Sequence, residues 1–81
     1  MTGTIQAADF EIVVFRPRPG GLRGNQLRHL PTGMGWELRR RADQTTLEMM
    51  RWVYAQATRD LIVLGWEPDE DWVRRMAEMN Q

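Results

Sequence analysis

The longest helical pattern in the chain is TTLEMMRWVYAQATRDLIVLG, residues 45–65. Thr45 followed three residues later by Glu48 has the spacing of a capping box, and it predicts a helix over residues 44–64, with Asp43 as a competing N-cap. Apolar residues recur there at steps of three and four, which predicts one buried stripe of Leu47, Met50, Tyr54, Ala57, Leu61 and Leu64. Residues 61–64 are equally consistent with a short strand, because periodicity cannot classify so short an apolar run.

A second helix is predicted over residues 68–79. Gly65 suits the C-terminal cap of the first helix, and Pro68 suits the first position of the next one. The acidic residues 69–71 then complement the helix dipole. The predicted buried face of this helix consists of Trp72, Val73, Met76 and Met79. Trp66, directly after the cap, is expected to pack against the end of the first helix.

The first half of the chain contains strand patterns. The run FEIVVF, residues 10–15, predicts a strand that is apolar on both faces and therefore central in a sheet or covered on both sides. Apolar and charged residues alternate over residues 35–40, which predicts a second strand able to pair with the first. Two strands alone are marginal in water, so a further strand at Thr4 to Ala8, or a partner subunit, would help to complete the sheet.

Residues 16–34 connect these two strands and are rich in proline, glycine and arginine. This composition predicts a long basic loop, with a short helical turn at Asn25 to Leu30. Loops of this length are generally functional or disordered. The predicted architecture is one small domain, residues 1–81, of the α+β class: a small antiparallel sheet of two or three strands, a long basic loop and two C-terminal helices that cover the sheet.

The charges are segregated although the net charge is zero. Residues 1–15 carry two acids (−2), residues 16–41 carry seven arginines and one acid (+6), and residues 42–81 carry four arginines and eight acids (−4). The positive segment is expected to attract phosphates or an acidic protein surface, although charge runs also occur merely as solvated loops. The candidate partner-binding arginines are Arg16, Arg18, Arg23, Arg28, Arg39, Arg40 and Arg41. In the predicted strand, Arg39 and Arg41 share one face and Arg40 lies on the other.

The long helix carries a second apolar stripe. Met49, Trp52, Gln56 and Val63 lie about 140° from the main stripe when residues are placed at 100° steps. So small a domain is not expected to cover both stripes, unless the sheet and the second helix enclose the helix more completely. Met49 and Trp52 are therefore further candidate partner-binding residues, because methionine and tryptophan are enriched at interfaces.

The residue inventory disfavours catalysis. The sequence contains no cysteine, serine or lysine and one histidine, His29. Most covalent catalysis, thiolate metal sites and disulfides are therefore excluded, and no nearby carboxylate is expected to orient His29. A phosphohydrolase that uses acids and arginine stays open as a minor alternative. We expect no enzyme activity, no cofactor and no metal site.

The sequence also bears on location. No apolar run approaches the roughly 20 residues that a membrane span needs. The first residues, MTGTIQAAD, lack the pattern of a signal peptide. We therefore expect a cytoplasmic protein without a membrane partner.

Two functional hypotheses follow. The first is a small interaction protein, an inhibitor or adaptor of the kind carried by phages and other mobile elements, that binds an acidic protein surface or a nucleoprotein complex through its arginine-rich loop and the Trp52 side of its long helix. The alternative is a module for RNA or single-stranded nucleic acid, with phosphate contacts from residues 39–41 and stacking on Trp36 and His29. An isoelectric point near 6.6 disfavours the alternative. Contacts between acidic and basic segments of two copies can also produce a homodimer.

Overall fold

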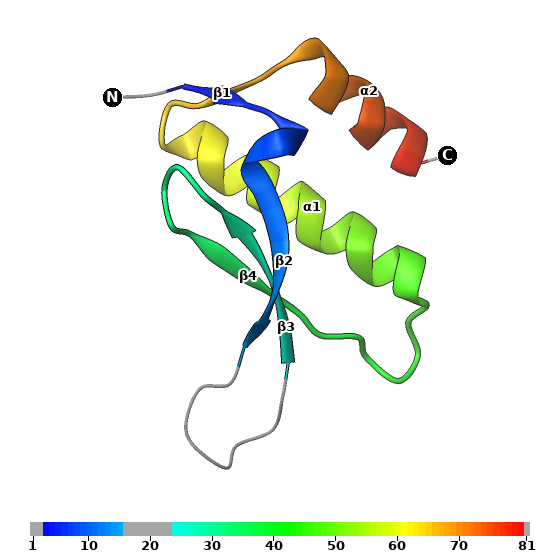
Figure 1. Ribbon diagram of the computed structural model, residues 1–81. Helices are drawn as coiled ribbons and strands as arrows, with labels where there is room; N and C mark the ends of the chain where they lie inside the picture. Colours follow the sequence, from blue (N-terminus) through cyan, green and yellow to red (C-terminus); the bar gives the residue numbers. More distant parts are fainter. Residues whose placement is uncertain (1–2, 16–23, 81) are drawn as a thin grey trace.

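The computed structural model describes residues 3–15 and 24–80 and has an α+β fold (Figure 1). Its main elements are an antiparallel three-stranded sheet and two C-terminal helices, as the sequence predicted. Figure 1 shows α1 lying along the sheet and α2 folded back beside α1. The elements are β2 (Phe10–Phe15), β3 (Gly24–His29), β4 (Gly35–Leu38), α1 (Thr46–Val63) and α2 (Glu70–Met79).

The centre of the sheet is β3, in a segment predicted to be a loop with a helical turn. The strand order is β2-β3-β4. Phe10 of β2 lies opposite His29, and Leu38 of β4 lies opposite Asn25. The predictions that the run at residues 10–15 is central and that it pairs with the strand after residue 34 are therefore wrong. The long basic loop is not confirmed, and residues 16–23 lie outside the described residues.

Tertiary pairing explains why β3 forms despite a sequence with weak strand propensity. Leu27 and His29 alternate toward the helices and are fully buried, whereas Arg28 between them is only half-buried. Hydrogen bonding to strands on both sides supplies the stability that glycine, asparagine and glutamine do not provide through propensity. A turn at Leu30 to Thr32 closes the β3–β4 hairpin, and Gly33 after it adopts a φ of 73°, which favours glycine.

A second, smaller sheet joins the N-terminal segment to the connection between the helices. It consists of β1 (Thr4–Ile5) and β5 (Glu67–Pro68), which pair in parallel. A 3₁₀ helix, η1 (Ala7–Asp9), follows β1. The predicted strand at Thr4 to Ala8 is therefore reduced to two residues, and it does not join the three-stranded sheet.

The start of α1 agrees with its predicted cap. The Thr45 hydroxyl accepts a hydrogen bond from the Glu48 N–H, and the Glu48 side chain accepts one from the Thr45 N–H. Residues 61–63 belong to this helix, so the strand alternative is wrong. The buried residues of α1 are Met49, Val53, Ala57 and Leu61. The prediction is confirmed for Ala57 and Leu61 and is wrong for Leu47 and Leu64, which are exposed, whereas Met50 and Tyr54 are half-buried.

The connection between the helices also follows its prediction. Gly65 has a φ of 95°, and the Trp66 N–H donates to the Leu61 carbonyl oxygen at 2.9 Å, which is typical of a helix end with glycine at the cap. The side chain of Asp69 caps α2 by accepting from the Trp72 N–H at 2.7 Å. Trp72 is buried as predicted, whereas Val73 is exposed, so its predicted place on the buried face is wrong.

The core lies between the sheet and the helices in two adjoining clusters. Leu27 of β3 packs there with Met49, Val53 and Ala57 of α1. Ile5, Leu61 and Trp72 form the other cluster, which joins β1 to both helices. Within the described residues, neither helix is both long and apolar enough to cross a membrane.

Candidate binding surface

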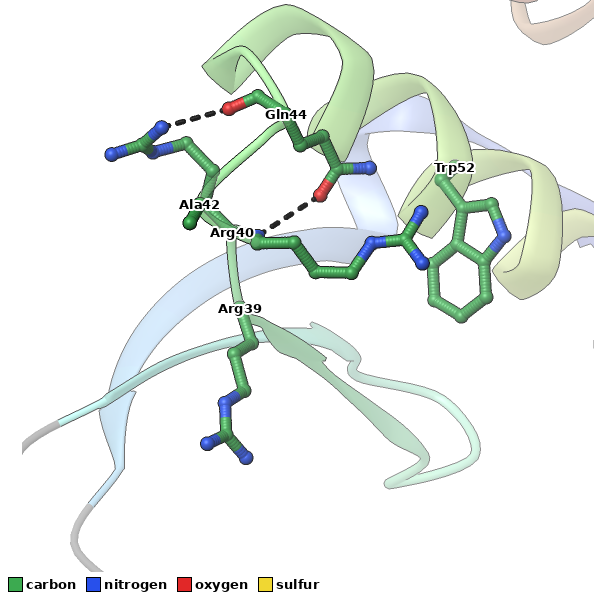
Figure 2. Close-up of a pocket in the computed structure, with 6 residues that line it drawn as sticks. Arg39, Arg40, Ala42, Gln44 and Trp52 are labelled. Carbon is green, nitrogen blue, oxygen red and sulfur yellow. Dashed lines mark hydrogen bonds between the residues drawn. The ribbon is translucent and has the colours of Figure 1, made fainter.

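The linker from β4 to α1 carries the three consecutive arginines. Because β4 ends at Leu38, Arg39 and Arg40 do not continue the strand, and the predicted alternation of faces is wrong. Gln44 holds the linker in a closed turn: its side-chain oxygen accepts from the Arg41 N–H at 3.2 Å, and its own N–H donates to the Arg41 carbonyl oxygen at 3.1 Å. Nη1 of Arg40 donates to the Gln44 carbonyl oxygen at 2.7 Å, as Figure 2 shows.

Trp52 projects from α1 beside this linker. Its side chain is 61% exposed, as the sequence predicted. Trp52 and the linker together border a cavity of about 570 Å³, lined by Arg39, Arg40, Arg41, Ala42, Gln44 and Trp52. Figure 2 shows the Trp52 ring on the side of α1 that faces the linker. We refer to residues 39–41 and Trp52 as the Arg–Trp surface.

The arginines of this surface are exposed, and among the described residues only the Arg40 side chain has a hydrogen bond, to Gln44. None of the three forms an ion pair with another described residue. The two ion pairs found among residues 3–15 and 24–80 both lie on α2, where Arg74 and Arg75 contact Asp71. The Arg–Trp surface therefore presents three arginines outside any described ion pair, next to a large apolar ring.

Other predicted site residues lie elsewhere. Arg28 is opposite Gly35, at the end of β4 away from the linker, and its Nη2 donates to the Gln26 side chain at 3.0 Å. Met49 is buried in the core, so its predicted exposure is wrong. Arg16, Arg18 and Arg23 lie outside the described residues.

Trp36 is tied to the core. Its ring is half-buried between the two core clusters, and its Nε1 donates to the Asp60 side chain at 2.8 Å. The hydrogen bond joins β4 to α1 across 24 positions of sequence. Stacking of the Trp36 indole on a base would therefore require it to give up its packing and its hydrogen bond to Asp60.

His29 is fully buried, not in a loop as predicted. Its ring packs against Phe10 and Trp66, with ring centroids 4.9 and 4.8 Å away. Nδ1 lies 2.8 Å from the Thr32 hydroxyl oxygen, while Nε2 is buried without a hydrogen-bond partner among the described residues. Burial lowers the pKa of His29, and the charge of Asp9 opposes this shift only in part. The predicted stacking role of His29 would require it to leave the core.

The stability of the fold is expected to fall as the solution becomes acidic, because of His29. The unfolded chain titrates near the ordinary pKa of 6.5, whereas the folded chain has a lower pKa and binds its proton only at lower pH. The contribution of neutral His29 to the free energy of unfolding is thus fully present above pH 6.5. It is lost as the pH falls from 6.5 toward the folded-state pKa. Urea unfolding at about pH 7.5 and pH 5.5 measures the loss, and His29→Gln should reduce it. An equal loss in that variant would contradict the assignment to His29.

Two structural residues of this region were not singled out from the sequence. Gln44 precedes the N-cap and Asp60 lies in the last turns of α1, and their partners depend on how the chain folds.

The helix face beyond Trp52 was only partly predicted. Its residues Trp52, Ala55, Gln56 and Arg59 line a hollow of about 210 Å³. Farther along, Ile62 and Val63 are exposed. The Arg–Trp surface therefore continues into a face of α1 that carries both polar and apolar side chains.

No group of three or more histidine or acidic side chains within residues 3–15 and 24–80 is placed to hold a metal ion. No family model, curated protein or solved structure matches the chain.

Proposed function

We propose that this chain is a non-enzymatic binding module whose Arg–Trp surface takes an acidic surface of a partner protein. The observation that carries the proposal is the exposed Trp52 ring beside three exposed arginines that have no described ion-pair partner. Arginine and tryptophan are the residue types that most often anchor interfaces. Such a module acts by occupancy, as a cytoplasmic inhibitor or adaptor does.

A protein partner is favoured over nucleic acid by what surrounds the Arg–Trp surface. Apolar residues continue along α1 to Ile62 and Val63, and this face suits side chains better than phosphates. The exposed acids Asp43 and Glu48 interrupt the positive charge that a nucleic-acid backbone would follow. Both aromatic residues predicted to stack on bases, Trp36 and His29, pack in the core.

A titration with two labelled probes tests this choice of partner. One probe is a glutamate-rich peptide containing leucine and tryptophan, and the other is single-stranded oligouridine, each followed by fluorescence anisotropy at two salt concentrations. We expect measurable affinity for the peptide that weakens with salt, and much weaker binding of the RNA. Tighter binding of RNA, with a steep dependence on salt, would replace the proposal by the nucleic-acid alternative.

Trp52→Ala is expected to separate binding from folding. Because the side chain is largely exposed, its removal should change the free energy of unfolding by no more than about 0.5 kcal/mol. Affinity for the acidic peptide should fall by about tenfold or more, since an interface tryptophan is a typical hot spot. Urea unfolding and the anisotropy titration measure the two effects. Exposed Val73 provides a control as Val73→Ala, and equal affinity loss in both variants would contradict a specific role for Trp52.

A further inference from the structure

The three-stranded sheet has a free edge at β2. In the part of the chain that the structure describes, β2 pairs with β3 on one side and with no strand on the other. Ile12 and Val14 lie on its helix-side face and are 54% and 60% exposed. Exposed apolar residues on an unpaired strand edge favour the addition of another strand.

Hydrogen-bond alternation identifies the backbone groups at this edge. The Leu30 N–H donates to the Asp9 carbonyl oxygen at 2.8 Å and extends the β2–β3 ladder by one residue. Asp9 therefore points its backbone toward β3, and by alternation so do Glu11 and Val13. The backbone groups of the residues between them point away from β3.

The free backbone groups belong to two residues. Phe10, Ile12 and Val14 are the positions of β2 whose backbone points outward. The N–H of Phe10 already donates to the Ala7 carbonyl oxygen at the end of η1. Ile12 and Val14 thus supply both the free hydrogen-bonding groups and the exposed apolar side chains.

The edge of β2 lacks the features that normally prevent strand pairing. Residues 10–15 contain no proline or basic residue, and Glu11, the one charge, lies on the opposite face from Ile12. The other edge strand, β4, is shorter, contains Glu37 and leads directly into three arginines. Arginines follow both edge strands in the chain, at Arg16 and at Arg39, so the β2 edge differs from the β4 edge in its greater length and in its exposed apolar residues, Ile12 and Val14.

A groove beside β2 extends this apolar surface. It lies between the sheet and the helices, has a volume of about 300 Å³ and borders Ile12. The helices contribute Tyr54, Met76 and Met79 to its wall, and its charged residues are Arg75 of α2 and Glu11 of β2. A strand added at β2 would place its own helix-side residues along the mouth of this groove.

We propose that the partner at this edge is a second copy of the chain, paired antiparallel through β2 about a twofold axis at Val13. In this register Ile12 of one copy lies opposite Val14 of the other, so the outward backbone groups of both residues find partners. An axis at Ile12 would instead require the outward N–H of Phe10, which is already engaged. The proposed register also keeps Glu11 away from its copy, as a self-complementary interface requires.

A disulfide test examines the register directly. The natural sequence contains no cysteine, so Val13→Cys can cross-link only through residue 13. The proposed axis places the two Cα atoms in a non-hydrogen-bonded pair at about 4.5 Å, within the range that a disulfide spans. Oxidation should give a covalent dimer, while Val73→Cys, on the exposed face of α2, should stay largely monomeric. Equal cross-linking of the two variants would overturn the proposal.

Sedimentation equilibrium over a series of concentrations tests the association itself. The unmodified chain should form dimers, and Val14→Lys should raise the dissociation constant by roughly 100-fold, because a symmetric interface receives the charge twice. Val73→Lys is the control, since Val73 is 55% exposed and Val14 is 60% exposed. Val14→Pro is a second variant, which removes one outward N–H and leaves the β2–β3 bonds in place.

Each outcome of this series decides the question. An unmodified chain that sediments as a monomer at every concentration overturns the proposal, and strand addition by another protein then becomes the explanation of the open edge. Dimers that survive Val14→Lys and Val14→Pro as well as they survive Val73→Lys overturn it too. The inference is independent of the Arg–Trp surface, because Arg39→Ala/Arg41→Ala should leave dimerisation unchanged.

Discussion

Trp72→Ala is expected to lower the free energy of unfolding by about 3–5 kcal/mol, the range for removal of a large buried aromatic side chain. Trp72 stacks on Phe10 with ring centroids 4.6 Å apart, and its Nε1 donates to the Thr58 hydroxyl oxygen at 2.9 Å. It thereby links α2 both to the sheet and to α1. For so small a domain, this loss is a large part of the stability that such folds usually have.

Urea unfolding followed by circular dichroism measures this effect. Trp72→Phe is the informative companion, because it keeps a ring in contact with Phe10 and removes the hydrogen bond to Thr58. Trp72→Phe should lower the free energy of unfolding by less than Trp72→Ala does, because it keeps part of the ring packing. Trp52→Ala is the matched tryptophan variant from the surface. If the changes at positions 72 and 52 cost the same, the assignment of one ring to the core and the other to the surface is wrong.

Arg39→Ala/Arg41→Ala is expected to weaken binding of the acidic peptide by about 10- to 100-fold, because two charge-assisted contacts are lost. Arg40 is left in place, since it donates to the Gln44 carbonyl oxygen and supports the linker. Both replaced side chains are exposed, so the free energy of unfolding should stay nearly constant. Anisotropy titration and urea unfolding report the two quantities.

The matched control for this prediction removes the same charge from α2. Arg74→Ala/Arg75→Ala changes the net charge equally, but both arginines already contact Asp71 and lower its pKa. The control should retain most of the affinity for the acidic peptide. If the two double variants lose affinity equally, attraction depends on net charge alone and the Arg–Trp surface has no specific role.

The helices were predictable because their signals are local. The Thr45–Glu48 capping box and the cap at Gly65 act within one turn of helix, and they fixed the ends of α1 to within two residues. The orientation of α1 was less accurate. Leu47 and Leu64 continue the apolar spacing at the helix ends, but they lie beyond the elements that bury its centre, and Met49 faces the core instead.

The sheet was only partly predictable, because β3 depends on its neighbours. Its residues favour turns by composition, and only Leu27 is strongly apolar. Leu27 and His29 alternate as buried strand residues do, but this signal is weak. It consists of two residues, one of them a histidine, in a segment rich in glycine and proline. A sheet without β3 places the run at residues 10–15 in a central position, whereas with β3 present this run is an edge strand.

The sequence predicted the residues of the Arg–Trp surface, but not that they lie next to one another. Exposure of Trp52 followed from helical spacing, and the arginines were evident from composition. Their meeting in one place depends on the short linker that Gln44 closes, and this turn has no clear sequence signature. The sequence did not indicate the contact of Trp36 with Asp60, because it joins positions far apart in the chain.

Mapping the acidic peptide on the ¹⁵N-labelled chain by NMR tests the central proposal most directly. Amide signals of residues 39–44 and the indole N–H of Trp52 should shift as peptide is added, and Trp52→Phe identifies the indole signal. Signals from the buried Trp72 indole, which donates to Thr58, should stay in place. Shifts confined to α2 or to the β2 edge, with the Arg–Trp surface unchanged, would contradict the proposed function.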